Sequence, residues 1–118
     1  MIRAFALCIG LTPMTALSQQ ATSGTGGELR ILDKVNGEVT DVTLSRGDSA
    51  RIGYLNITLE DCRYPSANPS GDAYAALSVW YRDESSPVFS GWLVASSPAL
   101  HAMEHPRYDV WVLRCSTS

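Results

Sequence analysis

Apolar and polar residues alternate along most of the chain, and this period of two constrains the fold more than any other sequence feature. Leu29 and Ile31 alternate with polar neighbours, and Leu55, Ile57 and Leu59 do so again. Successive side chains of a β-strand point to opposite faces, so the pattern is typical of strands with one buried face. A chain of 118 residues suits one domain built from such short strands.

Turn residues separate about seven runs of this kind. The strands are expected around 29–31, 42–44, 49–53, 55–60, 73–82, 88–95 and 108–115. Asn36-Gly37 predicts a two-residue hairpin in which both residues adopt positive φ. The run 88–95 is the most uniformly apolar, and we expect it at the centre of a sheet. The fold class predicted is all-β, an antiparallel β-sandwich or small barrel.

One short helical turn is expected near residues 99–105. Pro98 stands at its start, where a missing N–H costs little, and Pro106 ends it.

The first residues have the composition of a secretory signal peptide. Arg3 precedes a short apolar stretch, and small residues lead to a cleavage site near Ser18. We therefore assign 1–18 to a signal peptide, 19–27 to a flexible leader without large apolar side chains, and 28–118 to a single β-rich domain. A signal of this kind predicts an exported protein in an oxidising compartment.

Two cysteines, Cys62 and Cys115, remain after such cleavage. In an oxidising compartment a pair of thiols usually forms a structural disulfide. A redox-active pair is the alternative, although such pairs are usually close in sequence, as in C-x-x-C. Cys62 falls in the polar phase of its strand. Either a β-bulge shifts the phase before it, or the disulfide lies on the outer face.

The charge balance argues against several partners. The formal net charge is −3 at pH 7, and removal of Arg3 makes it more negative. A nucleic-acid binder would carry a basic excess. No run of roughly 20 apolar residues is present to form a membrane-spanning helix, so we expect neither nucleic-acid binding nor membrane insertion after signal removal.

Trp80, Trp92 and Trp111 all fall within expected strands. Because aromatic residues are enriched in strands, we interpret them as core-filling side chains. A stacking platform for sugars is the alternative.

The segment His101-Ala102-Met103-Glu104-His105 matches the H-x-x-E-H pattern of some zinc hydrolases. That chemistry needs both histidines on one face of a helix and a third ligand, for which the chain offers no further histidine. We therefore predict no metal, no cofactor and no catalytic residue.

Two connecting segments, 64–72 and 96–109, are rich in proline and hydrogen-bonding side chains. Leu100 and Met103 predict that the second packs against the domain. Long ordered loops often carry function, and a bond between Cys62 and Cys115 would bring these two together. The candidate partner-binding residues on them are Tyr64, Pro65, Ser97, Pro98, His105, Pro106 and Tyr108.

The stretches 61–65, 91–100 and 105–111, which read Asp-Cys-Arg-Tyr-Pro, Gly-Trp-Leu-Val-Ala-Ser-Ser-Pro-Ala-Leu and His-Pro-Arg-Tyr-Asp-Val-Trp, resemble the DUF2155 family of small exported bacterial proteins. The resemblance extends over about residues 28–116. It implies a periplasmic location, one β-rich domain and a Cys62–Cys115 bond, and it provides no catalytic residue to carry over to this chain.

These features together favour a non-enzymatic periplasmic β-domain that docks on another cell-envelope protein, for example as an accessory subunit of a membrane complex. A module that binds sugar or peptidoglycan fragments through its tryptophans is the first alternative. A small metal-dependent hydrolase at His101, Glu104 and His105 is the second.

Overall fold

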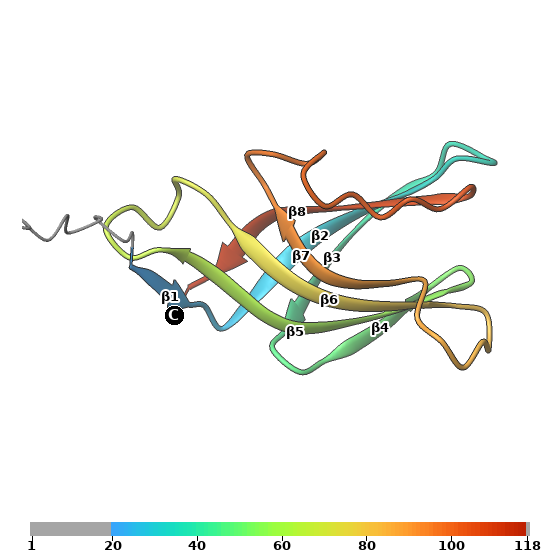
Figure 1. The fold of residues 1–118 in the computed structure, drawn as a ribbon, viewed down its shortest axis with the longest axis horizontal. Helices are drawn as coiled ribbons and strands as arrows, with labels where there is room; N and C mark the ends of the chain where they lie inside the picture. Colours follow the sequence, from blue (N-terminus) through green and yellow to red (C-terminus); the bar gives the residue numbers. More distant parts are fainter. Residues whose placement is uncertain (1–19, 118) are drawn as a thin grey trace, which may run out of the picture.

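Two antiparallel β-sheets form the described part of the chain, residues 20–117 of the computed structural model (Figure 1). The five-stranded sheet contains β1 (Ala21–Ser23), β4 (Ser49–Ile52), β5 (Leu55–Pro65), β6 (Tyr74–Tyr81) and β7 (Phe89–Val94). The three-stranded sheet contains β2 (Gly26–Asp33), β3 (Val39–Ser45) and β8 (Tyr108–Ser116). The predicted all-β class is confirmed, and because the sheets are separate, the architecture is a sandwich.

The order of strands leaves two strands, one from each sheet, without a second pairing partner on the same side of the sandwich. We call this the uncovered side. The large sheet runs β1-β5-β6-β7, with β4 also paired to β5, and the small sheet runs β3-β2-β8. Both β7 and β8 are therefore edge strands. The expectation that 88–95 is a central strand is wrong, because β7 lies at the edge of the large sheet. The strand is nevertheless apolar on both faces, since Trp92 lies on the exposed outer face and Leu93 lies in the core.

The core fills the space between the two sheets, as the period of two predicts. Each fully buried Leu, Ile or Val side chain contributes about 1.5–3 kcal/mol of hydrophobic stabilisation. The largest fully buried side chains are those of Leu29, Ile31, Leu55, Ile57, Leu59, Cys62, Leu77, Val79 and Tyr108.

The first hairpin is present, but its turn differs from the prediction. The loop between β2 and β3 spans five residues, because Asp33 N–H donates to Glu38 O and Gly37 N–H donates to Asp33 O. Gly37 has φ of +75°, whereas Asn36 is not in the positive-φ region. Asn36 instead accepts the N–H of Glu38 through its side chain, which fixes the longer loop.

A β-bulge resolves the phase of Cys62. The register between β5 and β6 shifts between Leu59 and Asp61, so one extra residue turns Cys62 inward, where it is fully buried. The predicted disulfide to Cys115 is present. It joins β5 of one sheet to β8 of the other near one end of the sandwich, which we call the disulfide end.

The predicted signal peptide, 1–18, lies outside the described residues. The described part of the predicted leader, residues 20–27, contains strands rather than a flexible segment. Residues 21–23 form β1, paired with residues 63–65 of β5, and β2 already begins at Gly26. A β-carbon at Gly26 would collide with the carbonyl oxygen of Leu44, so glycine here permits a close backbone approach.

The segment between β7 and β8 returns along the uncovered side of the sandwich, from the disulfide end to the opposite end (Figure 1). Its predicted helical turn is reduced to one hydrogen-bonded turn, in which Leu100 N–H donates to Ser97 O, and no helix occurs in residues 20–117. Met103 enters the core as predicted, but Leu100 remains 63% exposed.

The tryptophans lie outside the core, contrary to the core-filling interpretation. Trp92 is 41% exposed, and Trp80 and Trp111 are half-buried. The strand alternation explains this placement, because Trp80 shares the outer face of β6 with Ser78, while Leu77 and Val79 point inward.

Candidate docking site

The structure divides the seven candidate partner-binding residues between the two ends of the sandwich. Tyr64 and Pro65 end β5, and Ser97 and Pro98 follow β7, all toward the disulfide end. His105, Pro106 and Tyr108 lead into β8 at the opposite end, where Tyr54, Tyr81 and Tyr108 lie close together. We call this the tyrosine end. The candidates therefore do not form one continuous site.

The two connecting segments do meet, through Asp72 and Ser96. The carboxylate of Asp72 accepts the backbone N–H of Ser96 at 3.0 Å and its hydroxyl at 2.6 Å. Burial of Asp72 raises its pKa, but the hydrogen bonds from Ser96 and from Ala73 N–H outweigh burial and lower the pKa overall. This contact fixes the end of β7 beside the start of β6.

Between the edges of β7 and β8 lies a groove of about 390 Å³. Its lining is mainly apolar: Leu93, Val94, Ala95, Pro98, Val110, Trp111, Val112 and Leu113, with Arg30 at one side. Arg30 is held by two hydrogen bonds to Asp41, of 2.8 and 2.9 Å, so its charge is compensated. The groove therefore presents apolar side chains next to strand edges.

Leu113 is placed in the groove by a second bulge. Leu29 pairs with Val112 while Glu28 pairs with Arg114, which leaves Leu113 as the extra residue on β8. Bulges re-aim side chains at sheet edges. Leu113 also lines an adjoining hollow at the disulfide end, together with Asp72, Ser96 and Cys115, so one side chain connects the two depressions.

At the tyrosine end, Tyr108, the first residue of β8, contacts the turn between β4 and β5. Its ring is 1% exposed, and its hydroxyl accepts the N–H of Tyr54 at 3.2 Å. Gly53 in that turn has φ of +58°, and a β-carbon there would lie 2.6 Å from the Tyr108 hydroxyl oxygen. Glycine is therefore required for both conformation and space.

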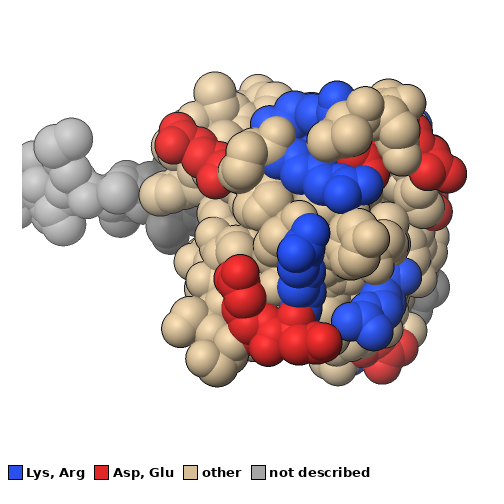
Figure 2. Space-filling model, turned by 90° about the vertical axis from the view of Figure 1, so that its right-hand side faces the viewer, with Lys and Arg blue, Asp and Glu red and all other residues tan. Residues whose placement is uncertain are grey.

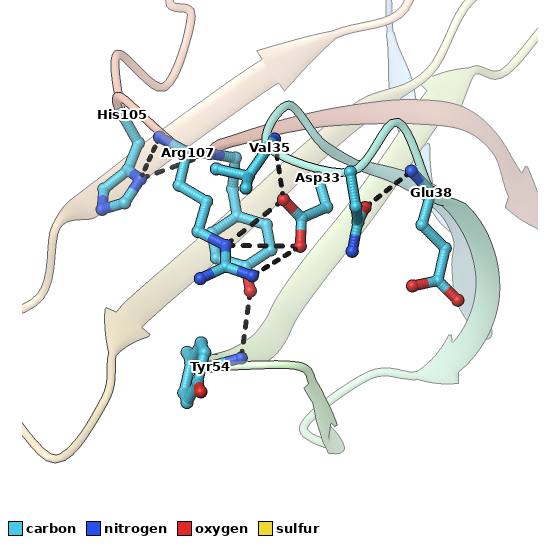
Figure 3. A network of polar contacts seen from close by, with 8 residues as sticks. Asp33, Val35, Glu38, Tyr54, His105 and Arg107 are labelled. Atoms are coloured by element: carbon cyan, nitrogen blue, oxygen red, sulfur yellow. Dashed lines mark hydrogen bonds and ion pairs between the residues drawn. The ribbon is translucent and has the colours of Figure 1, made fainter.

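Asp33 and Arg107 form the main ion pair of this end (Figure 3). The guanidinium of Arg107 donates to both carboxylate oxygens at 3.0–3.3 Å, and Val35 N–H donates to one of them at 3.0 Å. The hydrogen bond from Arg107 lowers the pKa of Asp33, although burial opposes this, and the pair raises the pKa of Arg107.

His105 serves as a hydrogen-bond acceptor for the chain around it. Its Nδ1 accepts the N–H groups of Arg107 at 3.0 Å and Tyr108 at 3.3 Å (Figure 3). Burial lowers the pKa of His105, the charge of Lys34 lowers it further, and Glu84 partly offsets these effects. These effects favour the neutral imidazole, whose Nδ1 already accepts two backbone hydrogen bonds.

The zinc-hydrolase alternative loses the helix that it requires. His101 and Glu104 are exposed in an irregular segment, and Met103 between them points into the core. Among residues 20–117, no group of three or more His, Cys, Asp or Glu side chains is arranged to hold a metal ion.

That same part of the chain contains no helix long and apolar enough to cross a membrane.

Arg82 completes the tyrosine end. It follows β6, and its guanidinium carbon lies 5.2 Å from the ring centres of both Tyr54 and Tyr81. Arg107 approaches Tyr54 at 5.0 Å. Figure 2 shows basic side chains across the middle of this end with acidic ones around them.

Sequence reasoning missed Tyr54, Tyr81, Arg82 and Leu113 as site residues. The bulge at Leu113 has no local signature, because it appears only when β8 is aligned with β2. The clustering at the tyrosine end depends on turns 53–54 and 82–87 meeting, through Arg82 N–H and Tyr54 O at 2.7 Å. The one available signal was Gly53-Tyr54 between two strands, a tight turn that exposes an aromatic ring.

These features define a class: a small antiparallel β-sandwich domain with an internal disulfide and an uncovered side between two edge strands. Residues 27–115 match the family described as "Uncharacterized protein conserved in bacteria (DUF2155)", and the chain belongs to this family, as its sequence resemblance predicted. It is similar to "Uncharacterized protein RP359" of Rickettsia prowazekii (strain Madrid E), with 28% identity over 94 residues. That similarity covers 77% of this chain and 61% of the relative, so the chain spans less than two thirds of that protein's length. No solved structure matches the chain.

Proposed function

We propose that this protein is a non-enzymatic periplasmic domain that docks on another cell-envelope protein by accepting an extended segment of it along β8. The occupant is a β-strand with apolar side chains at alternate positions. An accessory subunit of a membrane complex is one form that this role can take.

The observation that carries the proposal is the pairing state of β7 and β8. Each strand ends its sheet, and between them lies an apolar groove. Edge strands are normally protected by charges, prolines or a covering segment, because unpaired N–H and C=O groups accept a further strand. The segment that follows β7 passes along this side and places Pro98 in the groove lining, yet the groove beside it remains open. Beside the groove, Val110 to Leu113 carry no charge, and the nearest charged side chains of β8 are Asp109 on one side and Arg114 on the other.

The groove also suits the side chains of such a strand. A peptide that adds to a sheet edge gains affinity from main-chain hydrogen bonds, and specificity from pockets that receive alternate side chains. Trp111, half-buried at the groove wall, and Leu113, aimed by its bulge, offer apolar contacts of this type.

The periplasmic location in this proposal is supported by the Cys62–Cys115 disulfide, because such bonds persist in oxidising compartments. The composition of residues 1–18 agrees with export.

The proposal is tested by capture of partners from the native envelope on the tagged protein and on a Leu113→Glu variant. A charge in the groove should reduce capture of any strand-adding partner about tenfold or more, as expected for an interface anchor. Val39→Glu is the matched control. Val39 is an apolar residue at 55% exposure on β3, the opposite edge of the same sheet.

A captured protein supports the proposal only if a synthetic peptide from it binds the purified domain and fails to bind the Leu113→Glu variant. Equal capture by the two variants, with both folded, would contradict the proposal. Self-association through β8 would appear as a concentration-dependent dimer that Leu113→Glu dissolves, and would replace the foreign partner by a second copy.

A sugar-binding function is the second candidate, favoured by the outward placement of the tryptophans. Trp80 and Trp92 share the outer face of the large sheet, and between them Ala76 and Ser78 are only 8% and 6% exposed. Ser78 donates a 2.7 Å hydrogen bond to Glu60 on the same face. Tryptophan fluorescence titrated with peptidoglycan fragments should shift for the native protein and for Trp111→Phe, but not for Trp92→Ala. Spectra that stay unchanged for the native protein would rule out this function.

A further inference from the structure

Arg82 is distinguished from all other basic residues in the described part of the chain by its charge environment. Seven basic side chains there have a carboxylate within 4.0 Å: Arg30, Lys34, Arg46, Arg51, Arg63, Arg107 and Arg114. Arg82 has none among the described residues. Its guanidinium therefore makes no direct ion pair with a described carboxylate, although Asp83 follows it in sequence and lines the same hollow.

The backbone of Arg82 is equally distinctive. Its φ of +57° makes it the one non-glycine residue of the described chain in the left-handed region. An L-residue with a long side chain is disfavoured there relative to glycine. Strain of this kind often accompanies function, so the position calls for a reason to keep arginine.

The side chain is also pre-oriented. The guanidinium is held over the rings of Tyr54 and Tyr81, at 5.2 Å from each ring centre. Stacking on aromatic faces leaves the planar edge of a guanidinium free to donate two parallel hydrogen bonds. The ordering cost of the arginine is therefore reduced before any ligand arrives.

A hollow of about 520 Å³ opens beside this guanidinium, lined by Arg51, Gly53, Tyr54, Arg82 and Asp83. Asp83 approaches Arg51 at 3.5 Å, so the neighbouring acid engages that arginine. Tyr54, at 48% exposure, forms an accessible wall for apolar atoms next to the charge.

We infer that Arg82 and the hollow beside it bind a carboxylate on a peptide, with Tyr54 contacting the adjoining carbon atoms. A guanidinium fork matches the two oxygens of a carboxylate in one plane. The carboxylate comes from an Asp or Glu side chain or from a peptide C-terminus. This site lies at the tyrosine end and is independent of the groove between β7 and β8, so either can fail without the other.

The test is a titration of the ¹⁵N-labelled protein, followed through the Arg82 Nε–H and Tyr54 ring signals. N-acetylglycine represents a C-terminal carboxylate, and N-acetyl-glutamic acid α-amide represents a side-chain carboxylate. We expect saturable shifts of both signals, with binding weakened about tenfold or more in Arg82→Gln because a charge-assisted hydrogen bond is lost. The tighter of the two probes identifies the source.

Arg82→Gly serves as the second variant, since glycine suits the backbone and keeps the fold if Arg82→Gln does not. It should also lose binding. Arg46→Gln is the control, because Arg46 is an exposed arginine paired with Asp61 and distant in the fold. Non-saturable shifts, shifts reproduced by sodium chloride at equal ionic strength, or equal binding by Arg82→Gln would each overturn the inference.

Discussion

The two ends of the sandwich are stabilised in different ways. The disulfide end joins the sheets covalently, and close backbone contacts such as that of Gly26 with Leu44 leave no space for side chains. The tyrosine end joins them through hydrogen bonds, an ion pair and stacked rings around Tyr108. It also carries Arg82, which has positive φ and no carboxylate within 4.0 Å among the described residues. The two ends therefore differ in how they join the sheets, by a covalent bond at the disulfide end and by polar and aromatic contacts at the tyrosine end.

The largest expected effect is at the disulfide end. Replacing Cys62 and Cys115 together by alanine should lower the free energy of unfolding by about 4 kcal/mol, the chain-entropy value for a loop of this length. Urea unfolding of the oxidised protein and the double variant measures the difference. A loss below about 1 kcal/mol would contradict the division between the ends, because the covalent link would then contribute little.

Tyr108→Phe is the corresponding change at the tyrosine end. It removes the part-buried hydrogen bond from the N–H of Tyr54, and the loss of such a bond costs about 0.5–1.5 kcal/mol. Tyr64→Phe is the matched control, since its hydroxyl has no hydrogen-bond partner among the described residues. Thermal unfolding of both variants decides the matter, and equal stability of the two would remove the assigned role of the Tyr108 hydroxyl.

Arg82→Gly should leave stability unchanged or raise it by up to about 1.5 kcal/mol. Relief of the left-handed backbone contributes about 1–2 kcal/mol, and the lost stacking on tyrosine costs about 0.5–1 kcal/mol at an exposed site. Denaturant titration provides the measurement. A loss of more than about 1 kcal/mol would mean that Arg82 is there for stability.

The smallest expected effect concerns pH and His105. Its pKa in the folded protein is lower than in the unfolded chain, so the unfolded chain takes up the proton first. The stability contributed by neutral His105 is thus present above about pH 6.5 and lost as pH falls below that value. The surroundings agree, because Lys34 opposes protonation, Glu84 favours it less strongly, and the N–H groups of Arg107 and Tyr108 already occupy Nδ1.

Unfolding measured from pH 7.5 to pH 5 should therefore show a steeper loss of stability for the native protein than for His105→Gln. Identical slopes would show that another group titrates in this range.

The sequence predicted the local elements well, for identifiable reasons. Alternation located the strands from β2 to β8, and the pair of cysteines located the disulfide. The sequence could not predict that β7 is an edge strand. Apolar residues on both faces of a strand do not reveal whether another strand pairs with its second edge. The lack of large apolar side chains in 19–27 suggested a flexible leader, yet Gly26 lies in β2, where the backbone of Leu44 passes close by. Contacts of that kind depend on how distant strands pack.

The site was less predictable than the fold. His105 and Tyr108 were identified from the composition of their segment, but their partners Tyr54, Tyr81 and Arg82 come from turns that meet only in three dimensions. The conformation of Arg82 has no signature in its neighbours, since arginine rarely adopts positive φ. The tryptophans were expected inside because aromatic residues are enriched in strands, but that enrichment does not tell which face of a strand is covered.

The most direct test of the central claim, docking along β8, is site-specific photocrosslinking in the native envelope. A photoreactive amino acid is placed at Leu113 in the groove and, separately, at Val39 on the opposite edge. The account predicts one dominant adduct from position 113, mapping to an extended segment of an envelope protein, and no matching adduct from position 39. The same adducts from both positions, or none from position 113 in a folded protein, would contradict it.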